Sequence, residues 1–266
     1  MQKIKILFAL AALCGVCAFQ LCGGDKELDK SYRKAAKHYG FTIKTEPKFH
    51  RGVKGSILPV ARVEQDLNRF FEALGELGES FVKKSGLSRV IICSNLTLHG
   101  MPCAGVASGN TMYLSKGFSK RTVYHEMFHI FDKHSDDKDW QRCNHKRFIY
   151  RGIDFQDKPL SKNKKKKLEK NRLKYNIDFS GDFVTDYAQS DEKEDRAETF
   201  AYMIAHSKMF WQRAIKNRAL WMKMRYIIEM TSRNSLLGKD YWVKKFGPAA
   251  MNKKFPGTVP NSYSQK

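Results

Sequence analysis

The sequence is poor in acidic residues, in cysteines with metal-binding spacing and in long apolar runs. It has 49 Lys and Arg against 27 Asp and Glu, which gives a net charge of +22. The absence of an internal repeat excludes a repeat architecture. No cysteine pair has the spacing of a zinc–sulfur site. No nucleic-acid motif accompanies the positive charge, so we expect no nucleic-acid partner.

The one long apolar run lies at the N-terminus, over residues 6–21, and is too short for a comfortable membrane span. Lys3 and Lys5 precede it, and Gly23 and Gly24 follow it. This pattern predicts a signal peptide over residues 1–24 and an exported protein, which is secreted, periplasmic or attached to the cell envelope. Lipid attachment remains an alternative to ordinary cleavage, since three cysteines lie in this segment: Cys14, Cys17 and Cys22.

Export leaves three cysteines in the rest of the chain, Cys93, Cys103 and Cys143. An oxidising compartment would allow one disulfide and one odd thiol. Cys93 and Cys103 are the nearest pair in sequence and could form that disulfide. Three free thiols are the alternative.

The motif His-Glu-x-x-His occupies residues 125–129. Apolar residues recur at three and four positions around it, which predicts a helix over 120–133 after a short strand at 111–115. His125 and His129 therefore share one helix face and could bind one metal ion, while Glu126 could hold a water molecule. A catalytic zinc site usually needs a third protein ligand.

A second predicted helix, capped by Ser190 or Asp191, could supply that ligand. Glu194 and Glu198 lie on one face of it, and apolar residues lie on the other. The first carboxylate could bind the metal. The second could accept the free ring N–H of a ligand histidine and fix its tautomer.

The two motifs together, His-Glu-Met-Phe-His and Tyr-x6-Glu-x3-Glu-Thr-Phe-Ala, resemble the catalytic domain of anthrax lethal factor and a set of uncharacterised bacterial secreted metallopeptidases. The match covers roughly residues 85–230 and is specific at the motifs. It implies a zincin-like metallopeptidase domain of the gluzincin type. We therefore expect an α+β fold, predominantly helical with a small sheet. The substrate-recognition parts of lethal factor are not carried over.

The resemblance also implies a role for each motif residue and one Zn²⁺ per chain. The metal ligands would be His125, His129 and Glu194, and the general base would be Glu126. Glu198 would orient a ligand histidine, and Tyr187 would stabilise the oxyanion. The implied activity is zinc-dependent hydrolysis of a protein or peptide substrate. Two alternatives stay open: a zincin-fold binding protein that uses its basic surface, or a metal-dependent amidase acting on a non-peptide envelope substrate.

We expect the chain to divide into a signal segment at 1–24, an N-terminal extension at 25–55, a catalytic domain at 56–234 and an irregular tail at 235–266. The N-terminal extension is predicted to hold a helix near 31–38. The catalytic domain is predicted to start with an amphipathic helix within 59–85 that Gly86 ends, followed by a strand at 89–93. Two further strands are expected within 96–114, and a later helix over 209–230.

A basic insertion at about 135–180 separates the two motifs, and residues 162–174 are its densest lysine run. Such a run is usually a solvated surface. The functional alternative is an electrostatic arm for an anionic membrane surface, an envelope polymer or an acidic substrate.

Overall fold

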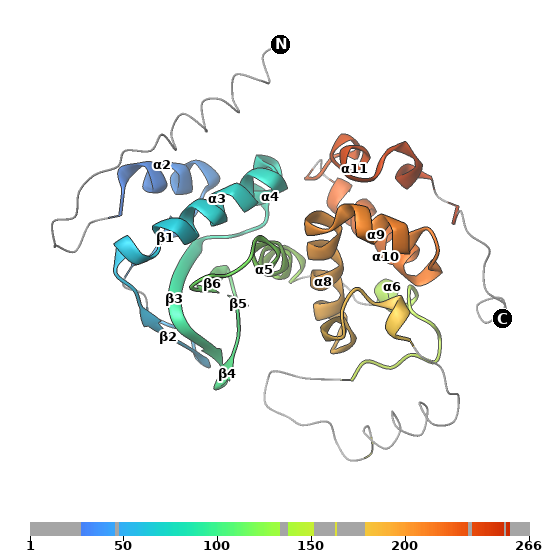
Figure 1. Cartoon of the computed structure of the whole chain (residues 1–266), viewed down its shortest axis with the longest axis horizontal. Helices are drawn as coiled ribbons and strands as arrows, with labels where there is room; N and C mark the ends of the chain where they lie inside the picture. Colours follow the sequence, from blue (N-terminus) through green and yellow to red (C-terminus); the bar gives the residue numbers. More distant parts are fainter. Residues whose placement is uncertain are drawn as a thin grey trace, which may run out of the picture.

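The computed structural model describes residues 28–45, 48–133, 138–151, 163, 179–233, 236–252 and 254–255. The predicted signal segment and, apart from Asn163, the lysine run at 162–174 lie outside these residues. The described chain forms two halves that meet at a central helix, α5 (Figure 1). One half contains a sheet with helices on it, and the other is helical. The mixture of helix and strand and the predominance of helix are confirmed, and the mixed sheet is compatible with the expected α+β class.

The sheet is mixed, with β3 as its longest strand. Its path is β1-β3-β6-β5, and β2 and β4 also pair with β3. The strand bounds are β1 Thr42–Ile43, β2 Val53–Ile57, β3 Arg89–Leu98, β4 Met101–Pro102, β5 Gly105–Ser108 and β6 Thr111–Ser115. β6 runs parallel to β3, whereas β5 runs antiparallel to β6 and ends the path. Among the strands that the structure describes, β5 therefore has one side without a partner strand.

The helices account for most of the remaining described chain. In the sheet half these are α2 Lys30–Tyr39, α3 Glu64–Leu77, α4 Glu79–Lys84 and α5 Lys120–Asp132, with a 3₁₀ turn η1 at Val60–Arg62. In the helical half they are α6 Lys138–Gln141, α8 Glu192–Ala205, α9 Ser207–Ala214, α10 Arg218–Ser232 and α11 Lys239–Phe246, with 3₁₀ turns η2 Ser180–Asp182, η3 Tyr187–Gln189 and η5 Pro248–Met251. None of the helices described is long and apolar enough to cross a membrane.

One large hydrophobic core joins the two halves. Helix α5 packs on β5, β6 and α3, and on its other side it packs along α8. The Phe128 ring lies 4.7 Å from the Phe200 ring, which in turn lies 5.4 Å from the Phe81 ring of α4. These fully buried aromatic contacts hold α5 and α8 side by side.

The amphipathic helix expected within 59–85 is in fact two helices. The apolar positions are buried as predicted, but the chain breaks at Gly78. Gly78 has φ of +85°, a left-handed conformation that favours glycine and ends α3. The helical spacing continues across the break, so periodicity alone did not reveal it. In the same way, the helix expected over 209–230 is split into α9 and α10.

The prediction of an irregular tail from residue 235 was wrong, because α11 lies within it. Trp242 is fully buried, and its ring stacks on Phe246 at 5.9 Å. Its indole N–H donates to the Thr231 hydroxyl of α10 at 3.1 Å. Long-range packing therefore stabilises a short helix that the local proline and glycine content disfavours.

The stretch assigned to an N-terminal extension contributes β1 and the start of β2 to the sheet. Strand β1 pairs parallel with β3, and β2 pairs antiparallel with it. Cys93, Cys103 and Cys143 are all free thiols, so the structure has no Cys93–Cys103 disulfide.

Candidate metal centre

Helix α5 forms as its sequence predicts and carries both motif histidines. The Ser119 hydroxyl caps it by accepting the Thr122 N–H at 3.2 Å. Its apolar positions face the core, among them Val123 and Met127, which are fully buried. His125 and His129 consequently lie one turn apart on the side that faces α8.

Helix α8 supplies the acidic side of the site. The Asp191 carboxylate caps it by accepting the N–H groups of Lys193 at 2.8 Å and Glu194 at 2.9 Å. Of the two predicted caps, Asp191 is therefore the one used. Glu194 lies in the first turn, where a negative charge suits the helix dipole. Glu198 lies one turn further on and also points toward α5.

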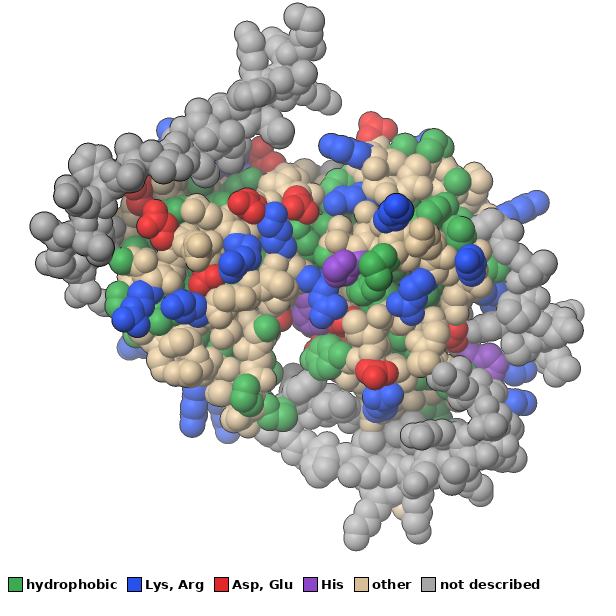
Figure 2. Space-filling view, in the orientation of Figure 1, with side chains coloured by type: hydrophobic (Ala, Val, Ile, Leu, Met, Phe, Trp, Pro, Cys, Tyr) green, Lys and Arg blue, Asp and Glu red, His purple; other side chains and the backbone are tan. Residues whose placement is uncertain are grey.

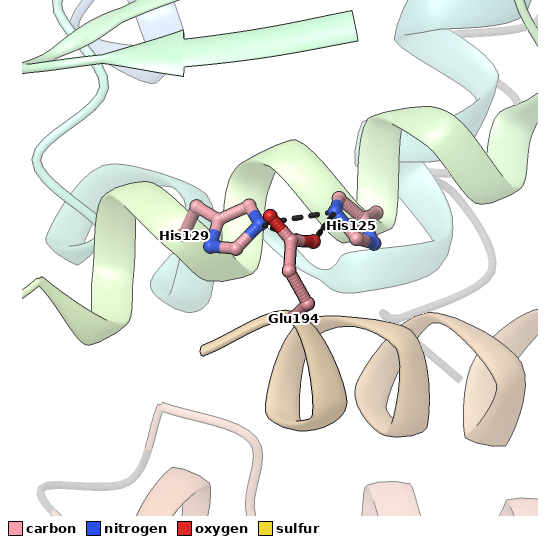
Figure 3. Close-up of side chains that lie close together, drawn as sticks. All are labelled: His125, His129 and Glu194. Atoms are coloured by element: carbon pink, nitrogen blue, oxygen red, sulfur yellow. Dashed lines mark hydrogen bonds and ion pairs between the residues drawn. The ribbon is translucent and has the colours of Figure 1, made fainter. Parts of the chain in front are cut away.

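Three potential metal donors converge between these helices (Figure 3). The Nε2 atoms of His125 and His129 lie 3.0 Å apart. The Oε2 atom of Glu194 lies 3.1 Å from the first of these nitrogens and 3.3 Å from the second. Two imidazoles and one carboxylate with converging donor atoms form a set that zinc accepts. In the part of the chain described, no other group of His, Cys, Asp and Glu is arranged in this way.

The surroundings of His125 also fit a metal ligand. Its Nδ1 lies 3.0 Å from Oε1 of Glu198, so a proton on Nδ1 leaves the lone pair of Nε2 for a metal ion. The other oxygen of Glu198 accepts a hydrogen bond of 2.7 Å from the Thr185 hydroxyl. The Arg121 guanidinium lies 3.9 Å from the same oxygen. Glu198 is thus held from three sides.

The electrostatics of the metal-free centre follow from these contacts. Burial alone would raise the pKa of Glu194, but hydrogen bonds from His125 and His129 outweigh it and hold that pKa well below its usual range. Burial also opposes a charge on His125, yet Glu194 and Glu198 overcome it and raise the pKa of His125 to about 10. Metal binding must displace the extra proton that these carboxylates stabilise on His125.

Glu126 lies beside the edge strand β5. Glu126 is only 6% exposed. Burial raises the pKa of its carboxyl, although the charges of His125 and His129 act in the opposite direction. The backbone N–H of Ala107 donates a hydrogen bond to it. Gly105 approaches it so closely that a Cβ atom there would lie 2.7 Å from Cγ and from Oε1 of Glu126. Strand β5 therefore positions this carboxylate.

Tyr187 lies at the other side of the centre, in turn η3. Its ring is 6.1 Å from that of His125, and its side chain hydrogen-bonds to Glu194. Burial, followed by the charge of Glu194, raises the pKa of Tyr187, so the phenol keeps its proton. The residue as a whole is still 38% exposed. Figure 2 shows the surface hollowed between the two halves, with histidine and acidic side chains inside the hollow.

All six residues singled out in the sequence thus meet at one place: His125, Glu126, His129, Tyr187, Glu194 and Glu198. Three neighbours were missed, namely Gly105, Arg121 and Thr185. Arg121 could have been found, because it lies one helical turn before His125. Thr185 and Gly105 approach the site through tertiary contacts and carry no local sequence signal.

The chain matches the model of a protein family. The family described as "Putative zinc-binding metallo-peptidase" covers residues 107–255, or 149 of the 266 residues (255 − 107 + 1). The chain belongs to this family of zinc-binding metallopeptidases. The matched region begins within β5 and includes α5, α8 and every residue of the centre except Gly105. Neither the comparison with curated proteins nor the comparison with solved structures gave a match.

Proposed function

We propose that this metallopeptidase is a zincin-like enzyme of the gluzincin type, with one zinc ion per chain held by His125, His129 and Glu194. The strongest support is that two acidic residues of one helix, α8, contact the motif histidines in different ways. Glu194 meets both Nε2 atoms, while Glu198 accepts from Nδ1 of His125. Such a carboxylate–histidine pair orients a metal ligand and raises its basicity.

Zinc, when bound, supplies Lewis acidity toward a water molecule and toward the scissile carbonyl group. In this proposal Glu126 accepts the proton of the attacking water and then gives it to the leaving amine. The Tyr187 hydroxyl turns from Glu194 to the carbonyl oxygen and stabilises the negative charge that develops there. Thr185 and Arg121 keep Glu198, and through it His125, in place.

We propose a peptide or protein substrate that binds in extended form along β5. This strand ends the sheet path, and its Gly105 and Ala107 lie against Glu126. An extended peptide can add a strand to such an edge through main-chain hydrogen bonds. Its backbone would then pass directly beside the proposed base. The cleavage preference of lethal factor is not part of this proposal.

We further propose that the enzyme is exported and acts at or beyond the cell envelope. The support is the N-terminal pattern of two lysines followed by the apolar run at 6–21. The lysine run at 162–174 would attract an anionic membrane surface or envelope polymer. A contact of this kind would concentrate the enzyme there without a dedicated binding pocket.

Metal analysis combined with a peptide-library digest tests the activity. The native chain is expected to contain about one zinc and to cleave a subset of peptides. Glu126→Gln should keep the zinc and lose hydrolysis, because an amide cannot accept the proton of the water. His129→Ala should lose most of the zinc. Wild-type turnover in Glu126→Gln would remove the base from the mechanism, and full zinc content in Glu194→Ala would overturn the ligand set.

A further inference from the structure

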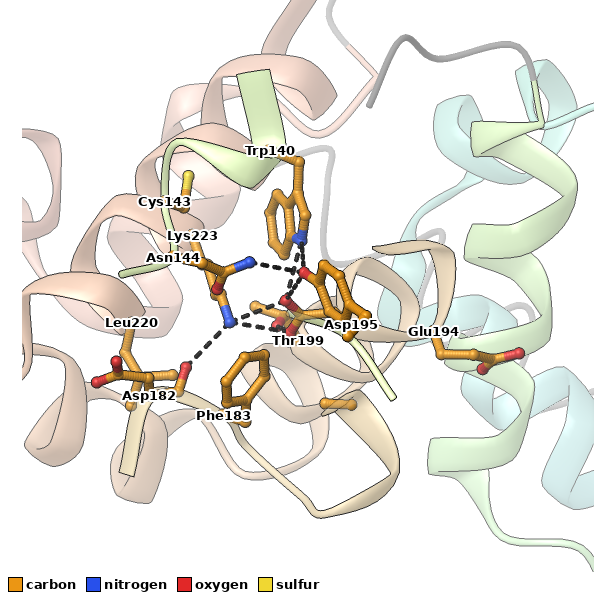
Figure 4. A network of polar contacts seen from close by, with 12 residues as sticks. Trp140, Cys143, Asn144, Asp182, Phe183, Glu194, Asp195, Thr199, Leu220 and Lys223 are labelled. Carbon is orange, nitrogen blue, oxygen red and sulfur yellow. Dashed lines mark hydrogen bonds and ion pairs between the residues drawn. The ribbon is translucent and has the colours of Figure 1, made fainter. Parts of the chain in front are cut away.

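Helix α8 presents two neighbouring acidic residues to opposite sides. Glu194 points toward α5 and the metal centre, whereas Asp195 points into the helical half (Figure 4). Asp195 is fully buried, and so is Lys223 of α10, its partner there. A buried lysine is rare, and the proposed mechanism gives this one no chemical task.

The Asp195 carboxylate is saturated with donors. Its Oδ2 accepts from Tyr150 at 2.7 Å, Lys223 at 2.8 Å and Trp140 at 3.0 Å. Its Oδ1 accepts from Lys223 at 3.1 Å and from Thr199 at 3.4 Å. So many donors, from α6, α10 and the chain near residue 150, leave the carboxylate one orientation.

Lys223 connects this cluster to the chain that leads into the metal centre. Its ammonium group donates to the backbone carbonyl of Asp182 at 3.0 Å and lies 3.6 Å from the centroid of the Phe183 ring. Two residues further on, Thr185 donates to Glu198. Lys223 therefore touches both the helix that presents Glu194 and the segment that supports Glu198.

Stability does not account for such a cluster. A buried ion pair loses much hydration, and replacing it by apolar side chains of similar size is often neutral or stabilising. The pair instead holds the first turn of α8 in one position and orientation, whereas helix ends otherwise fray. A second tether, from Arg196 Nε to Asp132 Oδ2 at 2.5 Å, holds α8 directly against the last turn of α5.

We infer that Asp195 and Lys223 form a positioning pair that fixes the first turn of α8 and thereby aims Glu194 at the two histidines. Neither residue touches the metal or the substrate, and both act through Glu194. This inference rests on the proposed function, because it assigns the pair to the geometry of that metal site. It predicts that metal affinity depends on the pair more than folding stability does.

The test removes both charges together in Lys223→Met/Asp195→Asn. Removing one partner alone would leave an uncompensated buried charge and destabilise the fold. Zinc affinity is measured by competition with a chromophoric chelator, and ligand geometry is followed by the visible absorption of the Co²⁺-loaded protein. We expect zinc affinity to fall by about tenfold or more, with a changed Co²⁺ spectrum and an unfolding midpoint within a few degrees of the wild type.

Tyr150→Phe is a milder variant that keeps the ion pair and the ring. It removes one donor to Oδ2 of Asp195, so zinc affinity should fall in the same direction but by less. If the double variant fails to fold, Tyr150→Phe still allows zinc affinity and the Co²⁺ spectrum to be compared with those of the wild type. Wild-type affinity and spectrum in Tyr150→Phe together with an unfolded double variant would overturn the inference.

Thr231→Val is the matched control on the same helix. Thr231 is fully buried, accepts from Trp242 at 3.1 Å and lies two turns beyond Lys223. This variant should lower the unfolding midpoint but keep the Co²⁺ spectrum and zinc affinity. An equal loss of affinity in Thr231→Val would show a general stability effect and overturn the inference.

The outcome also separates the inference from the proposed function. If the wild-type chain binds zinc and cleaves peptides while the folded double variant matches it in affinity and spectrum, only the positioning role is wrong. If the wild-type chain binds no zinc, the proposed function fails and the positioning role fails with it.

Discussion

Gly105→Ala tests whether strand β5 holds the proposed base in place. A Cβ atom at this position would lie 2.7 Å from Cγ and Oε1 of Glu126 and 2.8 Å from Cγ2 of Thr122. Ordinary contact begins at 3.4 Å, so the shortfall toward Glu126 is 0.7 Å (3.4 − 2.7). Thr122 is β-branched and stiff on its helix, so the Glu126 side chain has to give way.

A displacement of this size has a predictable effect on rate. Misplacing a catalytic group by about 1 Å can cost on the order of 100-fold, so kcat/KM should fall by roughly 10- to 100-fold. Crowding of this kind costs about 1–3 kcal/mol in folding free energy. Zinc content should stay near that of the wild type, because the added methyl group meets Glu126 and Thr122 and not the three proposed ligands.

The assay pairs peptide turnover with zinc content and an unfolding curve. Gly75→Ala in α3 is the control, since nothing lies within 4 Å of a Cβ atom there. It should leave turnover unchanged and stabilise the helix by up to about 1 kcal/mol. Unchanged kcat/KM in Gly105→Ala would refute the argument that β5 constrains Glu126. Loss of zinc would instead mean that the whole helix has moved.

Three further predictions concern the surroundings of the centre. Thr185→Val removes a 2.7 Å hydrogen bond to Glu198 and should weaken zinc binding about tenfold in a chelator titration; unchanged affinity would mean that Glu198 is held without it. Burial, followed by the charge of Glu126, raises the pKa of Cys103 from 9.0 to about 11. Below pH 9, iodoacetamide should therefore alkylate this thiol about 100-fold more slowly than an ordinary cysteine thiol. The rate of alkylation should rise with pH up to about pH 11. A rate that levels off near pH 9 would contradict this shift. Neutralising the four lysines at 164–167 should weaken co-sedimentation with anionic vesicles, most of all at low salt, and leave cleavage of a neutral peptide unchanged; equal binding at every salt concentration would return the run to an ordinary solvated surface.

Local patterns predicted the parts of the centre that depend on one element. The strand at 111–115 matches β6, the helix at 120–133 matches α5 within one residue, and the capping of α8 by Asp191 was one of two predicted choices. Each of these rests on side-chain periodicity or on a cap within a few residues. The helix pattern suggested Glu194 as the third ligand and the resemblance supported it, but no local pattern specified how the two helices lie, since Glu194 follows His129 by 65 positions.

The parts that were missed depend on contacts between distant residues. Helix α11 forms because Trp242 is buried against α10, and β2 forms because β3 offers it an edge. Thr185 has no motif around it and becomes important only where the chain after η2 passes Glu198. Sequence patterns specify which face of an element is buried, but they do not specify which element covers it.

The long interval between the two motifs does not compromise the centre, and the described contacts explain why. The Phe148 ring lies 5.6 Å from the Phe179 ring, and the Arg151 N–H donates to the Gln189 carbonyl at 3.0 Å. The described residues on the two sides of this interval therefore lie close together in the helical half. Doubling the number of residues between two points of a chain that already lie close together costs only about 0.6 kcal/mol, so the length of this interval has little effect on stability. The packing of α8 on α5 and the Arg196–Asp132 tether keep Glu194 close to the histidines whatever that length is. A charged insertion in the sequence between the two motifs consequently leaves the geometry of the centre unchanged.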